Sequence, residues 1–398
     1  RNHYLYETIL SGDIGNENDS TDNCYHIFYL PSDYSLDTNT ILDGFKITRG
    51  IASGVYPHNC GAGIFTNQPI KINNCSIKNN YSSNIGAGIY TTKYSNISNS
   101  IISENKALSY AGGIYTTTNT TITNSLFYKN TGSQGAAIYL LTKATITNTT
   151  IASNSASDKG GGIYSTSDSV HLNNSIIWGN TASSSGKQLY KTASAFSANN
   201  SCYSNGTNDI FGSVNKNSCI YTNPLFVNTA SADYRIYSNS PCIDVGNNDF
   251  INELYDIRST GYLRRLNGSN GNSGIVDMGA YEYKFGSDPT DSLYVPTPVL
   301  SLPVNHIAEV ILKPTFTWSS VNNAVSYTLQ VSTNQNFTNN IINTVSTLTS
   351  FTAQNDLNYN TKYYWKVKAY SNLRESEWSS VWDFTTCGSP ILTSPANN

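Results

Sequence analysis

A five-residue motif that returns at nearly constant spacing limits this chain to very few folds. Its copies read GAGIF, GAGIY, AGGIY, GAAIY, GGGIY and a decayed GKQLY, ending at Phe65, Tyr90, Tyr115, Tyr139, Tyr164 and Tyr190. The intervals between the copies are 25, 25, 24, 25 and 26 residues. Such regularity indicates a stacked repeat, in which each unit buries its apolar side against its neighbours.

Other positions keep the same period and show that each unit is made of strands and turns. Asparagine recurs at Asn74, Asn99, Asn124, Asn148, Asn174 and Asn200. Apolar residues lie two positions before and three after most of these asparagines, in short β-branched runs without a helical period. A coil of about 25 residues built in this way predicts a parallel β-helix, whereas a propeller blade needs about 40 residues. We expect the asparagines to hydrogen-bond to one another along the axis.

Several segments resemble a known family. The units GGGIY (160–164) and NSIIWGN (174–180) are similar to right-handed parallel β-helix repeats of large bacterial surface and secreted proteins. NPLFV (223–227), DYRIYSNSPCIDVG (233–246) and VDMGAYEY (276–283) resemble the closing part of the choice-of-anchor Q family. The resemblance covers roughly residues 8–283. It implies a right-handed parallel β-helix in a secreted or cell-surface protein, and it implies no particular reaction.

The pattern changes twice along the chain. The period dissolves after residue 200, so we interpret residues 201–283 as a cap over the open end of the β-helix domain, 1–283. Residues 284–297 contain Pro and Asp and are predicted to be a linker. Alternating strands follow in 298–387, which predicts an antiparallel β-sandwich. The fold class is therefore all-β, a parallel β-helix followed by a sandwich.

The sandwich resembles a fibronectin type III module. In that resemblance Trp318, Trp365 and Val367 are core residues of central strands. Residues 390–397 repeat the pattern of 298–305 at an offset of 92, so 388–398 is interpreted as the start of a further module or a linker.

The polar segments 13–23 and 50–59 are expected to be loops inserted in the first coils. They either bind a partner or are tolerated surface insertions.

The charge composition restricts the classes of partner. Only 12% of the residues are charged and the net charge is −3, which provides no basic surface for nucleic acid. No apolar run approaches the roughly 18 residues of a membrane span, so we expect no membrane insertion. The chain starts at Arg1, directly before a strand-like segment, and we interpret this start as processed. The expected location is secreted, extracellular or at the cell surface.

The candidate residues for catalysis are few. Parallel β-helix enzymes that cut acidic polysaccharides need clustered carboxylates, and no two carboxylates share a ladder between residues 61 and 200. We therefore predict no catalytic residue, with Asp244 and Asp277 as the alternative pair; their competing interpretation is a buried Asp paired with an Arg. A metal site at His58 and Cys60 lacks further ligands. No cofactor and no metal are expected.

Aromatic residues form the candidate binding strip. Strand alternation turns them outward at Tyr90, Tyr115, Tyr139, Tyr164, Tyr128 and Trp178. Exposed, stacked rings of this kind bind sugars or proteins, because a Tyr face is apolar and its hydroxyl is polar. The alternative is that the strip only stabilises the sheet or is covered by turns.

Seven cysteines occur in the chain, and Cys202 with Cys219 is the predicted disulfide.

The function predicted from these patterns is an extracellular, non-enzymatic surface or structural protein, a rigid β-helix on a fibronectin-like stalk for adhesion or assembly. Its partner would be a glycan, a cell-surface or matrix protein, or another copy of the chain. The alternatives are a fibre subunit that assembles end to end, and a polysaccharide lyase or glycoside hydrolase.

Overall fold

The computed structural model describes residues 7–16, 19–167, 169–192, 196–258, 262–264, 267–268, 272–284, 295, 297–321, 324–371 and 375–389. The chain divides into two compact units, Arg1–Asp288 and Pro289–Asn398, which are described separately. Their boundary falls in the predicted linker, most of which lies outside the described residues. The predicted start of a further module is described only at its first residues, Gly388 and Ser389.

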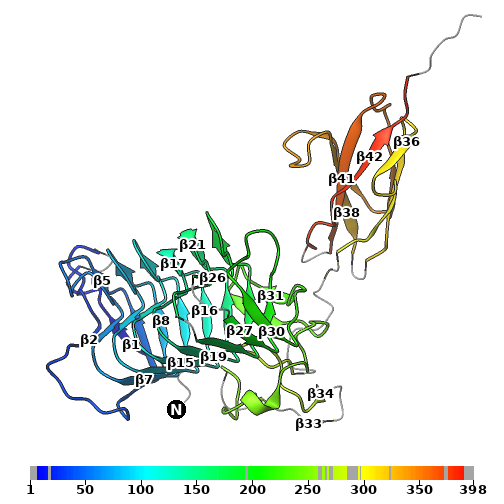
Figure 1. Cartoon of the computed structure of the whole chain (residues 1–398). Coiled ribbons are helices and arrows are strands. Elements are labelled where there is room, and N and C mark those ends of the chain that lie inside the picture. The colour runs from blue at the N-terminus through cyan, green and yellow to red at the C-terminus, as the bar shows by residue number, and fades with distance from the viewer. Residues whose placement is uncertain are drawn as a thin grey trace, which may run out of the picture. The chain divides into compact units, whose positions relative to one another are not determined.

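The first unit is a parallel β-solenoid of four sheets, named A to D here (Figure 1). Sheet A contains β1 (Thr8–Ser11), β4 (Phe45–Thr48), β8 (Ser76–Lys78), β12 (Ile101–Ser103), β16 (Leu126–Tyr128), β20 (Thr150–Ala152), β24 (Ile176–Trp178) and β28 (Cys202–Tyr203). Sheet B contains β2 (Phe28–Leu30), β6 (Ile64–Thr66), β10 (Ile89–Thr91), β14 (Ile114–Thr116), β18 (Ile138–Leu140), β22 (Ile163–Ser165), β26 (Leu189–Lys191) and β29 (Ile210–Phe211).

Two further sheets complete each coil. Sheet C contains β3 (Ile41–Asp43), β7 (Ile70–Asn73), β11 (Ser95–Ser98), β15 (Thr120–Thr123), β19 (Ala144–Thr147), β23 (Val170–Asn173), β27 (Phe196–Asn199) and β30 (Val214–Asn217). The shorter sheet D contains β5 (Ile51–Ala52), β9 (Tyr81–Ser82), β13 (Lys106–Ala107), β17 (Thr131–Gln134), β21 (Ser155–Lys159) and β25 (Thr181–Ala182). The predicted fold class is confirmed.

The repeat period sets the register of every sheet. In sheet B, Tyr90 lies opposite Phe65 on one side and Tyr115 on the other. The residue before each ring points inward, and Ile64, Ile89 and Ile114 are completely buried. Inward residues from sheets A, B and C therefore stack on like residues to form one continuous apolar core.

The six predicted ladder asparagines occupy the turn between sheets C and A. Each has a left-handed backbone, with φ between 44° and 50°, a conformation that Asn tolerates better than most residues. The prediction that their side chains bond to one another along the axis is wrong at most positions. Asn124 does donate to Asn99, but Asn148, Asn174 and Asn200 donate to main-chain carbonyls of a later segment. The turn, rather than the ladder, accounts for the repeated Asn.

A second set of asparagines forms the ladder of side-chain hydrogen bonds along the axis that was predicted for the first set. Its members are Asn80, Asn105, Asn130, Asn154 and Asn180, each at most 2% exposed. Each side-chain amide donates to the amide oxygen of the next member at 2.9–3.0 Å, and Asn180 ends the ladder on Gln188 at 2.8 Å. The polar groups at this buried corner are thus satisfied within the corner itself.

The described residues between 222 and 284, called the return segment here, run back along the flank of the solenoid. They contain a hairpin of β31 (Phe226–Asn228) and β32 (Asp233–Ile236), a single 3-10 turn η1 (Asn248–Phe250), and the short pair β33 (Asn267–Gly268) and β34 (Asn272–Ser273). We predicted a cap over the solenoid end from residue 201. Instead, residues up to Asn217 continue the coils, and the return segment packs on the outer side of sheet A and the asparagine turns.

The second unit is a β-sandwich. One sheet contains β35 (Leu300–Leu302), β37 (Thr315–Trp318) and β40 (Ser350–Thr352). The other contains β36 (Ile307–Val310), β42 (Trp382–Thr386), β41 (Lys362–Tyr370), β38 (Ser326–Ser332) and β39 (Asn340–Ser346). Trp365 and Val367 are fully buried and Trp318 is nearly so, as predicted for core positions.

Candidate functional site

The repeated aromatic residues form one continuous stack on the outer side of sheet B. Neighbouring ring centroids from Phe65 to Phe211 are 4.4–5.7 Å apart, and the ring planes diverge by at most 21°. This stack, the aromatic ladder, consists of Tyr29, Phe65, Tyr90, Tyr115, Tyr139, Tyr164, Tyr190 and Phe211. The in-register strands impose it, because each coil places its ring directly over the ring of the coil before.

The middle of the aromatic ladder is less exposed than we predicted. Tyr90, Tyr139 and Tyr190 are each only 7% exposed, because their faces are occupied by neighbouring rings. Burial is the main cause that raises the pKa of the Tyr90, Tyr115, Tyr139 and Tyr164 hydroxyls. Tyr115 and Tyr164 are half-buried, and the largest exposure of the ladder is at its two ends, where Tyr29 is 40% and Phe211 45% exposed.

Tyr128 and Trp178 lie on a different sheet from the four tyrosines. Both project from sheet A, and the return segment covers them: the Tyr128 ring is 5.2 Å from Tyr234, and Trp178 packs with Ile236 and Met278. The predicted six-residue strip is therefore two groups of residues. Sequence counting recognised the outward direction of these side chains but not the segment that packs over them.

The two predicted insertions meet at the first end of the aromatic ladder. Tyr25, His26 and Tyr29 follow the first insertion, and Tyr56 and His58 belong to the second; these five residues are called the aromatic cluster. Tyr25 stacks on His58 at 5.2 Å, and His26 stacks on Tyr29 at 4.9 Å. Tyr25 is 45% and Tyr56 61% exposed, so this cluster presents aromatic surface that the ladder does not. The five residues of the cluster do not recur with the repeat period. The only sequence signal for the cluster was the length of the two inserted loops.

A histidine pair connects the two insertions within the cluster. His26 Nδ1 lies 3.0 Å from the Gly61 carbonyl oxygen, so this nitrogen must donate. His26 Nε2 then accepts from Nδ1 of His58 at 3.0 Å. Burial, and secondarily the charge of His58, lower the pKa of His26. The cluster therefore favours a neutral His26 imidazole.

The alternative catalytic pair does come together. Asp277 Oδ1 accepts the main-chain N–H of Asp244 at 2.8 Å, and Oδ2 accepts that of Tyr283 at 2.6 Å. Asp277 is 2% exposed, and burial raises the pKa of its carboxyl to about 7 against the effect of these two donors. Both oxygens face main-chain donors of the return segment. This geometry fits a structural group.

An arginine fastens the same region to the solenoid. Arg264, 1% exposed, forms an ion pair with Glu282 at 2.7 Å and donates to Asn124 of the coils. It also donates to the carbonyls of Gly279 and Ala280 at 3.0 Å. Burial and the charge of Asp277 raise the pKa of Glu282. We predicted an Asp–Arg pair here; the direct partner of Arg264 is Glu282.

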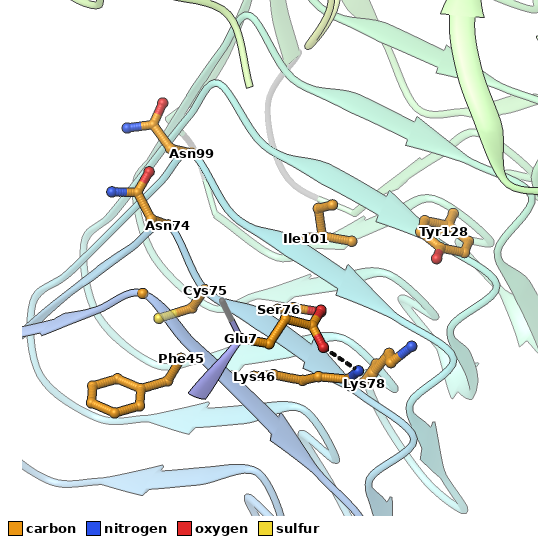
Figure 2. Close-up of a pocket in the computed structure, with 11 residues that line it drawn as sticks. Glu7, Phe45, Lys46, Asn74, Cys75, Ser76, Lys78, Asn99, Ile101 and Tyr128 are labelled. Atoms are coloured by element: carbon orange, nitrogen blue, oxygen red, sulfur yellow. Dashed lines mark hydrogen bonds and ion pairs between the residues drawn. The ribbon is translucent and has the colours of Figure 1, made fainter. Parts of the chain in front are cut away.

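A pocket of about 200 Å³ lies on sheet A where the return segment no longer covers it (Figure 2). Its polar rim includes Lys78 and the ion pair of Lys46 with Glu7, whose atoms are 2.7 Å apart. Asn74 and Asn99 lie one above the other beside it, and Ile101 and Tyr128 form its apolar side (Figure 2). Of the predicted site residues, only Tyr128 reaches this pocket.

The cysteines are free in the structure, so the predicted Cys202–Cys219 disulfide is not present. Strand alternation explains the difference. Cys202 faces outward from sheet A, opposite Ile176 in register, whereas Cys219 packs against the interior core and contacts the Ala198 carbonyl at 3.3 Å. The Cys202 thiol donates to the Thr222 carbonyl at 3.3 Å, and Cys242 of the return segment lies in the same buried cluster.

In the described part of the chain, no three His, Cys, Asp or Glu side chains gather in a way that would hold a metal ion. The described residues also form no helix with the length and hydrophobicity needed to cross a membrane.

Comparison with known proteins gives little beyond the sandwich. No family model matches the chain, and no curated protein matches it. The fibronectin type III domain derived from human KIAA0970 protein matches 26% of this chain and 81% of its own length, with 23% identity and a TM-score of 0.19. The fibronectin type-III domain of human fibronectin type III domain containing protein 3 matches 26% and 92%, with 25% identity and the same score. At such scores neither match adds to what the strand order shows.

Proposed function

We propose that this chain is an extracellular, non-enzymatic surface protein that binds glycans at the aromatic cluster. The solenoid serves as a rigid support, and the sandwich as a connecting module. A parallel solenoid joined to a fibronectin-like sandwich fits a structural or surface protein in general. The choice-of-anchor Q resemblance agrees with this location, and adhesion is the proposed use.

One observation carries the binding proposal. Tyr25, Tyr29 and Tyr56 expose 40–61% of their surface and gather at one end of a stack in which Tyr90, Tyr139 and Tyr190 are buried. The Tyr56 ring also lies edge-to-face against the Phe65 ring, with centroids 6.2 Å apart, which joins the second insertion to the ladder. Preformed aromatic faces with polar hydroxyls suit the apolar faces and hydroxyl rims of sugar rings.

The proposal is tested by binding to a glycan array, followed by calorimetry with the strongest neutral oligosaccharide. Tyr56→Ala and Tyr25→Ala should each weaken binding at least about fivefold, because each removes a stacking face worth about 1 kcal/mol or more. Tyr359→Ala, at a 44% exposed sandwich tyrosine, is the matched control and should bind as the wild type does. Binding that is absent, or unaffected by the two cluster substitutions, would exclude a glycan site here; captured matrix protein would favour a protein partner.

A further inference from the structure

The two buried cysteines at the junction of the last coil and the return segment form a site that the proposed function does not use. Cys202 lies on β28 and Cys242 lies 40 positions later. Both are completely buried in one cluster with Ile176, Ile236 and Met278. We propose that Cys202 and Cys242 form a disulfide that fastens the return segment to the solenoid.

The surroundings fix the backbone at both cysteines. Cys202 is fixed by the parallel pairing of β28 with β24, and its main-chain N–H donates to the Ser175 carbonyl at 2.8 Å. Cys242 is fixed from the other side, because its carbonyl accepts the Met278 N–H at 3.0 Å and its N–H donates to the Ser240 hydroxyl. The Cys202 thiol reaches the Thr222 carbonyl at 3.3 Å, and both cysteine side chains lie in the same buried cluster. The two thiols are therefore brought into one closed site from two different elements.

The chemistry of the step is thiol–disulfide exchange. One thiolate attacks a low-molecular-weight disulfide such as oxidised glutathione, forms a mixed disulfide and releases one glutathione thiol. The second thiolate then displaces the other glutathione, so that one S–S bond forms in the protein. Two protein thiols are oxidised, and one small disulfide is reduced to two thiols.

Burial sets when this step takes place. Neither side chain is exposed to solvent, and the partner thiol and burial together raise the pKa of Cys202, which disfavours the reactive thiolate. The exchange must therefore occur while the return segment is still undocked, during folding. Once formed, the link is shielded from reductants by the same packing.

The test is oxidative refolding of the full-length chain. Denatured, reduced protein is refolded in a buffer of reduced and oxidised glutathione, then denatured, alkylated and mapped by mass spectrometry without reduction. We expect a linked peptide pair containing Cys202 and Cys242, and alkylation of the other five of the seven cysteines. Alkylation of all seven, or a link from Cys202 to any other cysteine, would overturn the proposal.

A second measurement tests the fastening itself. Reduction under denaturing conditions followed by refolding without oxidant should lower the Tm by about 5 °C or more, as loss of a link that closes a loop of this length predicts. Cys24→Ser, at a partly exposed cysteine, should show the same difference, and Cys242→Ser should show none. A mapped link whose reduction leaves the Tm unchanged would contradict the fastening role.

Discussion

At the scale of single residues, position in the coil decides what an asparagine does. Asn124 and Asn130 are six positions apart and both recur with the same period. Asn124 has a φ of 49° and forms a turn, whereas Asn130 is an inward ladder member bonded on both sides. Periodicity alone treats them alike, and only the backbone conformation separates the two roles.

Replacing a ladder member should be costly. Asn130→Leu removes the oxygen that accepts both the Asn105 main-chain N–H and the Asn105 side-chain amide, so two buried donors lose this acceptor. Each unsatisfied buried group costs about 1–3 kcal/mol, so the free energy of unfolding should fall by about 2–6 kcal/mol in denaturant titration. Asn119→Leu, at an exposed position of the same coil, is the control with little expected effect. Equal stability of the two variants would show that the ladder contributes nothing.

The histidine pair predicts sensitivity to acid. Because the pKa of His26 is lowered in the folded chain, unfolding takes up a proton between the folded and the ordinary value of about 6.5. This contribution to stability is complete above pH 6.5 and is lost as the pH falls toward the folded pKa. Protonation also places an N–H on Nε2, facing the His58 N–H.

The measurement is the rate of proteolytic cleavage in the loop 53–59 as a function of pH, using a protease active from pH 5 to 8. Cleavage should increase below pH 6.5 in the wild type. His26→Gln, which keeps a neutral hydrogen-bonding side chain, should flatten this dependence. An identical increase in the variant would assign the acid sensitivity to another group.

At the scale of elements, the return segment depends on a close approach of backbone to the solenoid. Gly279 has a φ of 95°, and its N–H donates to the Asn174 carbonyl at 2.7 Å. A Cβ at this position would lie 2.8 Å from both Ile176 Cδ1 and Thr150 Oγ1. Only glycine therefore fits between the return segment and sheet A.

Gly279→Ala should loosen the return segment while leaving the coils folded. We expect a cost of about 1–3 kcal/mol from the strained backbone, in addition to the clash. Hydrogen exchange followed by mass spectrometry should show faster exchange in residues 272–284 and unchanged exchange in β10, β14 and β18. Gly388→Ala, where an added Cβ meets nothing within 4 Å, is the control. Unchanged protection of 272–284 would show that this approach is not required.

The sequence was sufficient to predict the coils but not what packs on them. The interval from Tyr90 to Tyr115 gives the strand register directly, because in-register strands place equivalent residues opposite each other. The hydrogen bond from Arg264 to Asn124 spans 140 positions of the sequence. Most of the other hydrogen bonds that Arg264 donates go to main-chain carbonyls. Because every residue has a main-chain carbonyl, bonds to such acceptors produce no recognisable pattern of residue types in the sequence. For the same reason the aromatic cluster was predictable only as two loops of unknown arrangement.

At the scale of the whole molecule, the proposed function predicts no polysaccharide degradation. Of the two carboxylates considered for catalysis, Asp277 is enclosed in the return segment and 2% exposed. Incubation with pectin, alginate or chondroitin should release no unsaturated or reducing ends above background, and a commercial lyase serves as the positive control. Release by the wild type that is lost in Asp244→Asn would overturn the non-enzymatic proposal.

The return segment also determines how this protein bears mechanical load. A pull on the chain beyond residue 284 reaches the solenoid along its flank, through bonds to Asn124, Asn148, Asn174 and Asn200 that are spread over successive coils. These bonds must break before tension from this side reaches the last coil, whereas a pull applied directly to the last coil would peel the strands away one at a time. We therefore expect the unfolding force in single-molecule stretching to be set by the flank, and the coils to resist tension that would unravel a solenoid held by its end.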